Sequence, residues 1–176
     1  MTTSSGLDRL HLLRDAGAVT RFHTSRIRAQ RLSEHSHGVV ELILAVRPDA
    51  SSALLIAALR HDVYELFTGD MPATTKWANP ELAYALSKVE GALDADHQLV
   101  PKLEEADQLL LKWADMMELV LYTFEELKGG NRYASTLMWN GLDALKTYKL
   151  GETDAPKVKA LEAAIRLEIK LWSAKN

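Results

Sequence analysis

Apolar residues recur along this chain at the three- and four-residue spacing of α-helices, and the alternating pattern of β-strands is nearly absent. One clear example begins at Ser51 or Ser52, either of which can cap a helix with Leu54, Leu55 and Ala58 on its apolar face. Because the same spacing returns from end to end, the pattern predicts an all-α protein, a compact bundle of about six or seven helices.

Prolines, glycines and capping residues set the expected limits of these helices. We expect helices over residues 7–15, 33–46, 52–67, 80–93, 101–128, 132–150 and 155–174. Residues 19–31 are too rich in Arg and Thr to assign, residues 68–72 are expected to form a turn, and residues 94–100 a connection. The segment 101–128 is apolar over much of its circumference, so we expect it at the centre of the bundle, ending at Gly129 and Gly130.

The composition is that of an ordinary globular protein. Its 176 residues fit one domain (1–176), 47% are hydrophobic, 26% are charged, and the formal net charge is -3. This charge argues against a partner of duplex nucleic acid. The first six residues do not have the pattern of a secretory signal, and the longest apolar run, 53–59, is too short to cross a membrane. We therefore expect a cytoplasmic protein with no membrane partner.

The chain has no cysteine, which excludes disulfides, zinc ribbons and thiol nucleophiles. A metal ion would therefore need His, Asp or Glu ligands. His61 and Asp62 are adjacent on an expected helix, about 100° apart, and can reach one ion if that helix flanks it. Glu65 follows at the spacing that returns to the same side. A further ligand must come from another helix, and His35 is the best candidate. Taken alone, the His-Asp pair also fits a solvent-exposed surface pair.

Other sites are disfavoured by their motifs. No glycine-rich phosphate loop, Walker lysine or Gly-x-Ser-x-Gly elbow is present, which argues against P-loop enzymes, kinases and α/β-hydrolases. Glu34 and His37 form one Glu-x-x-His, whereas a di-iron carboxylate bundle needs two. Residues 94–97 are dense in Asp and His but have no defined ligand spacing, so we interpret them as a hydrated acidic loop.

Several motifs in series resemble the HD superfamily of phosphohydrolases. They are Arg21-Phe22, Ser33-Glu34-His35-Ser36, His61-Asp62 with Glu65, Thr68-Gly69-Asp70-Met71-Pro72 with Lys76, Lys112-Trp113-Ala114-Asp115, Glu125-Glu126-Leu127 and Gly130-Asn131. More narrowly, they resemble the bacterial 5′-deoxynucleotidases and the phage dATP triphosphohydrolases (DatZ). The resemblance covers about residues 19–131 and leaves the C-terminal helices, 132–174, outside it. A series of motifs is much more specific than any one of them.

The resemblance implies a divalent metal ion, with Zn, Co and Mn the first candidates. It implies four ligands: His35, His61, Asp62 and Asp115. Asp107 competes for the fourth position, because it also follows an alanine on the same expected helix. We prefer Asp115, since the Glu-Glu-Leu and Gly-Asn sequences after it match the register of the family.

The resemblance also implies the surroundings of the metal. Glu65 would handle the attacking water or the leaving group, and Asp70 would belong to the catalytic site. Arg21 and Lys76 would bind phosphate oxygens. Phe22 would contact the substrate where the family has Trp, and a phenyl ring can still stack on a sugar or base.

The expected function is metal-dependent hydrolysis of deoxynucleoside 5′-phosphates. Because the chain is compact, we rank a dATP triphosphohydrolase first, releasing deoxyadenosine and triphosphate in phage nucleotide-pool control. A 5′-deoxynucleotidase acting on deoxynucleoside monophosphates is second, and a non-catalytic nucleotide-binding or interaction module is the alternative from another class. The partner is thus a deoxynucleotide, and we also expect a homo-oligomer.

Overall fold

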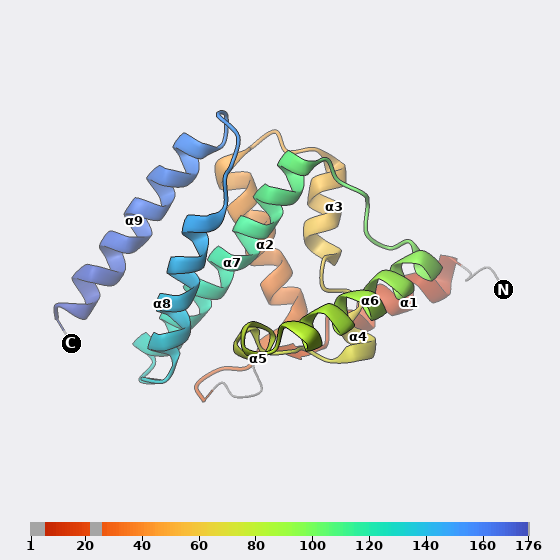
Figure 1. The fold of residues 1–176 in the computed structure, drawn as a ribbon, viewed down its shortest axis with the longest axis horizontal. Coiled ribbons are helices and arrows are strands. Elements are labelled where there is room, and N and C mark those ends of the chain that lie inside the picture. Colours follow the sequence, from red (N-terminus) through yellow and green to blue (C-terminus); the bar gives the residue numbers. More distant parts are fainter. Residues whose placement is uncertain (1–5, 22–25, 176) are drawn as a thin grey trace.

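A computed structural model describes residues 6–21 and 26–175, and these residues form nine α-helices, one short 3₁₀ helix and a two-stranded sheet (Figure 1). The elements are α1 (Gly6–Ala16), β1 (Thr20–Arg21), β2 (Gln30–Arg31), α2 (Leu32–Val46), α3 (Ser52–Arg60), α4 (Glu65–Thr68), α5 (Ala73–Ala78), α6 (Pro80–His97), α7 (Glu105–Lys128), α8 (Ala134–Ala144), η1 (Leu145–Thr147) and α9 (Ala155–Ser173). The all-α prediction is confirmed, with more helices than the six or seven expected. In the described part of the chain, no helix has the length and apolar character needed to span a bilayer.

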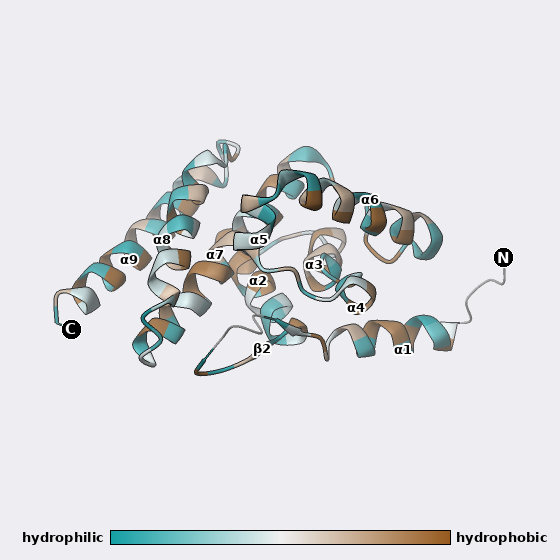
Figure 2. Cartoon of the chain, turned by 60° about the horizontal axis from the view of Figure 1, so that its bottom comes forward, coloured by the Kyte–Doolittle hydropathy of each residue, from teal (hydrophilic) through white to brown (hydrophobic). Residues whose placement is uncertain are grey.

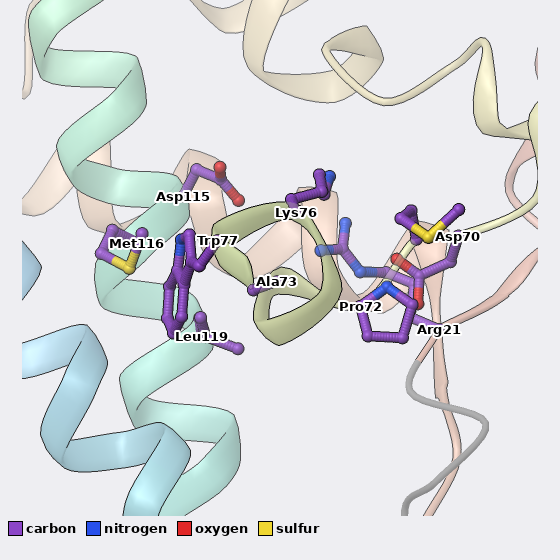
Figure 3. Close-up of a pocket in the computed structure, with 10 residues that line it drawn as sticks. Arg21, Asp70, Pro72, Ala73, Lys76, Trp77, Asp115, Met116 and Leu119 are labelled. Atoms are coloured by element: carbon purple, nitrogen blue, oxygen red, sulfur yellow. The ribbon is translucent and has the colours of Figure 1, made fainter. Parts of the chain in front are cut away.

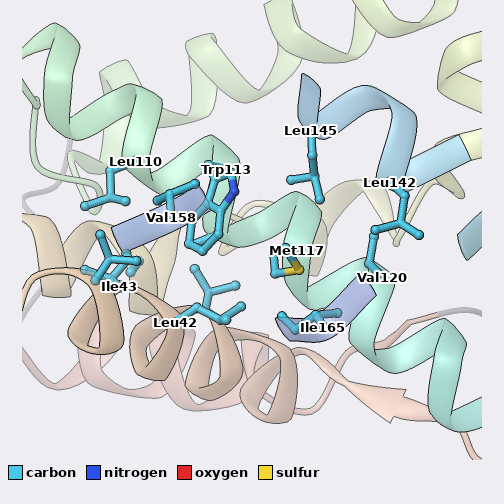
Figure 4. Packing of buried hydrophobic residues seen from close by; sticks show 14 of the residues in the cluster. Leu42, Ile43, Leu110, Trp113, Met117, Val120, Leu142, Leu145, Val158 and Ile165 are labelled. Carbon is cyan, nitrogen blue, oxygen red and sulfur yellow. The ribbon is translucent and has the colours of Figure 1, made fainter. Parts of the chain in front are cut away.

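Helix α7 is the centre of the main hydrophobic core, as its apolar circumference predicted. It packs against α2, α3 and α8, and Figure 4 shows Trp113, Met117 and Val120 of α7 among apolar side chains of α2, α8 and α9. Trp113 is fully buried, and its indole Nε1 donates to Glu162 Oε1 of α9 at 2.9 Å. The hydropathy colouring agrees, since the apolar segments of α2, α3 and α7 meet in the middle of the molecule (Figure 2). These helices form the frame that holds the site.

A smaller cluster joins α1 to the turn after α3. Its buried members are Ala16, Leu32, Val63, Tyr64 and Leu99. The Tyr64 hydroxyl also donates to Asp94 Oδ1 at 2.6 Å and accepts from the backbone N–H of Leu99. This cluster therefore fixes the segment that follows α3.

The predicted continuous helix over residues 52–67 is wrong, although its Ser51 cap is present: Ser51 Oγ accepts from Leu54 N at 3.2 Å. Helix α3 ends at Arg60, residues 61–64 form a turn, and α4 begins at Glu65. Within this turn, backbone N–H groups donate to carbonyls three residues back, as from Val63 to Arg60. Burial of the neighbouring Val63 and Tyr64 in the smaller cluster explains why the chain leaves the α-helical path there.

Other predicted limits also move. Helix α6 continues to His97, so residues 94–97 are its last turn and not a connection; Asp94 accepts from Tyr64. Helix α7 begins at Glu105 and not at 101, and the helix expected over 132–150 ends at Ala144, followed by η1. Residues 73–78, to which no helix was assigned, form α5, and the Asn79 amide donates to Thr75 O at its end.

Strands β1 and β2 form a short antiparallel hairpin directly before α2, with Arg21 paired opposite Gln30. The end of the connection between its strands is tied to Glu126 on α7. This buried carboxylate accepts from Arg26 N and Ile27 N at 3.3 Å and from Arg28 N at 2.8 Å, and from the Asn131 amide at 2.8 Å. Glu126 and Asn131, two residues of the series of motifs, thus anchor the hairpin that carries Arg21.

Candidate metal centre

Three separate segments bring four metal-ligand side chains together. His35 comes from α2, His61 and Asp62 from the turn after α3, and Asp115 from α7. One ligand atom from each lies within 4.8 Å of all the others, and in the described part of the chain this is the one such group found. The four residues proposed as ligands from the sequence are thus adjacent.

The spacing of these atoms fits one ion. The Nε2 atoms of His35 and His61 are 3.1 Å apart, His35 Nε2 is 3.1 Å from Asp115 Oδ1, and His61 Nε2 is 3.3 Å from Asp62 Oδ2. Ligand bonds of about 2.0–2.2 Å around one tetrahedral ion place donors roughly 3.4 Å apart. The distances are close to that value.

The local backbone sets which nitrogen of His61 faces the centre. Its Nδ1 lies 2.8 Å from the carbonyl oxygen of Ala58. A carbonyl can only accept, so Nδ1 carries a proton, and in the neutral ring Nε2 is then the nitrogen that can bind an ion at the cluster. This arrangement follows from the turn, because His61 stands directly after the end of α3.

Buried charges of both signs perturb the four groups. Burial lowers the pKa of the His35 imidazole. Burial opposes the charged forms of His61 and Asp62 too, but their mutual attraction outweighs it: the pKa of His61 lies well above its ordinary value and that of Asp62 well below. Burial is likewise outweighed at Asp115, where hydrogen bonds from His35 and His61 lower the pKa. The carboxylates are thus held ionised, the form in which they bind a cation.

Glu65 lies at the start of α4, beside this centre, and is 4% exposed. Its Oε2 is buried and has no hydrogen-bond partner in the structure. Burial, together with the negative charge of Asp62, raises the pKa of Glu65 to about 8. A carboxyl with such a pKa can hold or release a proton near neutral pH, which suits a general acid or base.

Arg21 joins the hairpin to the cluster. Its Nη1 contacts Asp62 Oδ2, and the side chain is almost fully buried. Burial disfavours the charged guanidinium, but Asp62, Glu65 and Asp115 outweigh it and raise the pKa of Arg21. A permanently charged arginine therefore stands at the edge of the cluster.

A pocket of about 170 Å³ opens beside the cluster. Its lining includes Asp115 together with the predicted substrate residues Arg21 and Lys76 and the predicted catalytic residue Asp70 (Figure 3). These side chains come from α7, β1, α5 and the segment before α5. Phe22, the remaining predicted substrate contact, lies outside the described residues.

Asp107, the competing fourth ligand, lies elsewhere on α7. Its Oδ1 is 2.5 Å from Arg47 Nη1, and Arg47 also pairs with Asp154 at 2.6 Å. Asp107 lies eight positions before Asp115 on α7, in a structural ion-pair network that is separate from the centre.

Sequence reasoning missed the apolar part of the pocket. Trp77, Met116 and Leu119 line it with the charged residues. Met116 follows Asp115 directly and Leu119 lies one turn later, so their positions on the helix of Asp115 were a usable signal. Trp77 could not be placed, because α5 was not predicted.

Comparison with known proteins gives one family. The family model described as 5′-deoxynucleotidase YfbR-like matches residues 10–161. A 5′-deoxynucleotidase of Vibrio parahaemolyticus is 33% identical over 44% of this chain and 48% of its own length. A 5′-deoxynucleotidase of Erwinia tasmaniensis is 30% identical over 60% of this chain and 65% of its own length. The chain thus spans about half to just under two thirds of these curated relatives.

Solved structures give the same fold. An HD-domain phosphohydrolase from Listeria innocua has a TM-score of 0.73 at 23% identity, covering 91% of this chain and 87% of that one. The HD phosphohydrolase DatZ of cyanophage S-2L, solved with dA and one catalytic Zn²⁺ ion, has a TM-score of 0.66 at 20% identity, covering 97% and 99%.

Proposed function

Because the chain belongs to the YfbR-like family of HD-domain 5′-deoxynucleotidases, we propose that it is a metal-dependent phosphohydrolase that releases orthophosphate from deoxynucleoside 5′-monophosphates. The observation that carries the proposal is that a candidate metal centre and a pocket lie next to each other. The His35, His61, Asp62 and Asp115 cluster borders a pocket whose lining carries cationic side chains.

The sequence-based ranking, with dATP first, is thereby reversed. The family and the curated relatives are named for the monophosphate activity, whereas the likeness to DatZ is one of fold at 20% identity.

Each side chain then has a role in phosphate-ester hydrolysis. His35, His61, Asp62 and Asp115 hold the divalent ion. When bound, the ion supplies positive charge for phosphate oxygens and lowers the pKa of a water molecule. Arg21 and Lys76 orient the phosphate and stabilise the charge that develops on it. Glu65, whose pKa lies near neutrality, takes the proton of the attacking water or gives one to the departing 5′ oxygen.

Product analysis tests the proposal. Purified protein is incubated with deoxynucleoside monophosphates and triphosphates under Mn²⁺, Co²⁺ and Zn²⁺, and orthophosphate and triphosphate are quantified by ion-exchange chromatography. We expect orthophosphate from the monophosphates, loss of turnover in Asp62→Ala, and normal turnover in Asp96→Ala, a change at an exposed aspartate of α6. Release of triphosphate from dATP without turnover of monophosphates would restore the dATP ranking. Self-association remains a prediction, checked by light scattering of the same sample.

A further inference from the structure

The pocket beside the metal centre has two unlike sides. Arg21, Asp70 and Lys76 make one side polar and charged. On the other side, Trp77 of α5 lies next to Met116 and Leu119 of α7 (Figure 3). A ligand with an anionic group at one end and an apolar group at the other fits these two sides.

The apolar side is continuous with the metal centre. Asp115 and Leu119 are one helical turn apart on α7, and Met116 follows Asp115 directly, so the carboxylate adjoins the apolar surface. A ligand that approaches an ion at Asp115 meets this surface at once.

Packing holds the apolar side in place. Leu119 is buried and packs with Tyr122, Met116 and Ala73. Ala73 and Trp77 are one turn apart on α5, so the contact of Ala73 with α7 also keeps Trp77 over that face. The indole is thus positioned by the fold.

Trp77 is nevertheless 41% exposed. An indole ring left open in a pocket is a platform for stacking, because every base has a π-face, and the sulfur of Met116 adds a polarisable contact.

We propose that Trp77, with Met116 and Leu119, binds the nucleobase of the substrate, while the phosphate lies toward Arg21, Lys76 and the metal centre. The inference rests on the proposed function and adds to it the residues that recognise the base. Because stacking on an indole depends on ring area more than on hydrogen-bonding pattern, this side favours purines over pyrimidines without excluding either.

The kinetic test uses a substrate with a base and one without. kcat and KM are measured for dAMP, dTMP and 2-deoxyribose 5-phosphate in the wild type, Trp77→Ala and Trp77→Phe. We expect Trp77→Ala to raise the KM for dAMP about tenfold, in the range that base–aromatic stacking supports, with kcat within twofold. Trp77→Phe should retain most of the affinity, and the KM for the sugar phosphate should change by less than twofold.

The matched control is Trp139 on α8, a tryptophan of similar exposure, 49%, that is not part of the pocket lining. Trp139→Ala should leave all the constants unchanged. Equal losses on dAMP and on the sugar phosphate in Trp77→Ala would overturn the inference while leaving the proposed function standing.

Binding is measured separately, so that the inference does not depend on turnover. Addition of dAMP should quench the tryptophan fluorescence of the wild type and of Trp139→Phe, and should quench that of Trp77→Phe much less. Equal quenching in Trp77→Phe and the wild type would overturn the inference, whether or not the protein hydrolyses dAMP.

Discussion

Glu126 offers a sharp test of the anchor that holds the Arg21 hairpin. The carboxylate is 4% exposed and accepts two hydrogen bonds at 2.8 Å, from Arg28 N and the Asn131 amide, and two longer ones at 3.3 Å. Hydrogen bonds to a charged group contribute about 1.5–3 kcal/mol each. The backbone N–H groups of residues 26–28 belong to an exposed segment and can bind water after truncation, so we expect Glu126→Ala to lower the free energy of unfolding by about 3 kcal/mol.

For a chain of this size, 1 kcal/mol corresponds to about 2–4 °C, so the Tm measured by circular dichroism should fall by about 9 °C. Its neighbour is the control: Glu125 is 62% exposed and meets Arg28 at 3.6 Å. An exposed pair contributes at most about 1 kcal/mol, so Glu125→Ala should change the Tm by less than about 4 °C. Because the hairpin carries Arg21, Glu126→Ala should also raise the KM for deoxynucleoside monophosphates.

The dependence on pH gives a second check. Burial raises the pKa of Glu126, but hydrogen bonds from Asn131 and from the backbone of residues 26–28 outweigh it, and the pKa lies below its ordinary value. The folded state therefore favours the ionised form, and its stabilisation is complete above the unfolded-state pKa of about 4.3. It is lost as the pH falls through the lower pKa of the folded state. Equal losses of Tm in Glu125→Ala and Glu126→Ala, or a difference that persists in strong acid, would refute the reasoning.

Three further outcomes are expected. Removal of the metal ion with a chelator should abolish phosphate release and lower the Tm, because an ion present at 1,000 times its Kd stabilises the folded state by about 4 kcal/mol. An unchanged Tm would contradict a structural role for the ion. Asp115→Asn should lose the metal measured by mass spectrometry, whereas Asp107→Asn should keep it and lose stability, because its partner is Arg47; the reverse result would exchange their roles. Glu65→Gln should lose at least about 100-fold in kcat. In the metal-free wild type, a pKa of about 8 for Glu65 means that the free energy of unfolding falls as the pH rises from the ordinary glutamate pKa toward 8. Glutamine cannot ionise, so at pH 8 the metal-free Glu65→Gln variant should melt several degrees above the wild type. No such gain, or one equally large at pH 4, would argue against that pKa.

Local patterns predicted the helices well where the chain carries its own start and stop signals. The Ser51 cap begins α3, and two glycines follow the end of α7. The break after Arg60 could not be predicted, because no glycine or proline marks it. Its determinants are distant in sequence: Tyr64 packs with Leu99 and hydrogen-bonds to Asp94.

Local spacing predicted only part of the candidate metal centre. A regular helix through Glu65 was the wrong geometry, since the His61-Asp62 pair lies in a turn. Separating Asp115 from Asp107 required the register of distant motifs, and the structure gives the physical reason: Arg47 pairs with Asp107 at the far end of α7. The apolar side of the pocket depends on α5, which the sequence did not reveal.

Helix α6 is far less buried than α2 and α7. None of its 18 residues is buried, and hydrogen bonds near its ends, at Asn79 and Asp94, tie it to its neighbours. Stability is therefore distributed unevenly along the chain. Amide protons of α6 should exchange with solvent through local opening, whereas those of α7 should exchange only through global unfolding. The outer face of α6 can thus accept many substitutions while α2, α3 and α7, which position the four candidate ligands, stay intact.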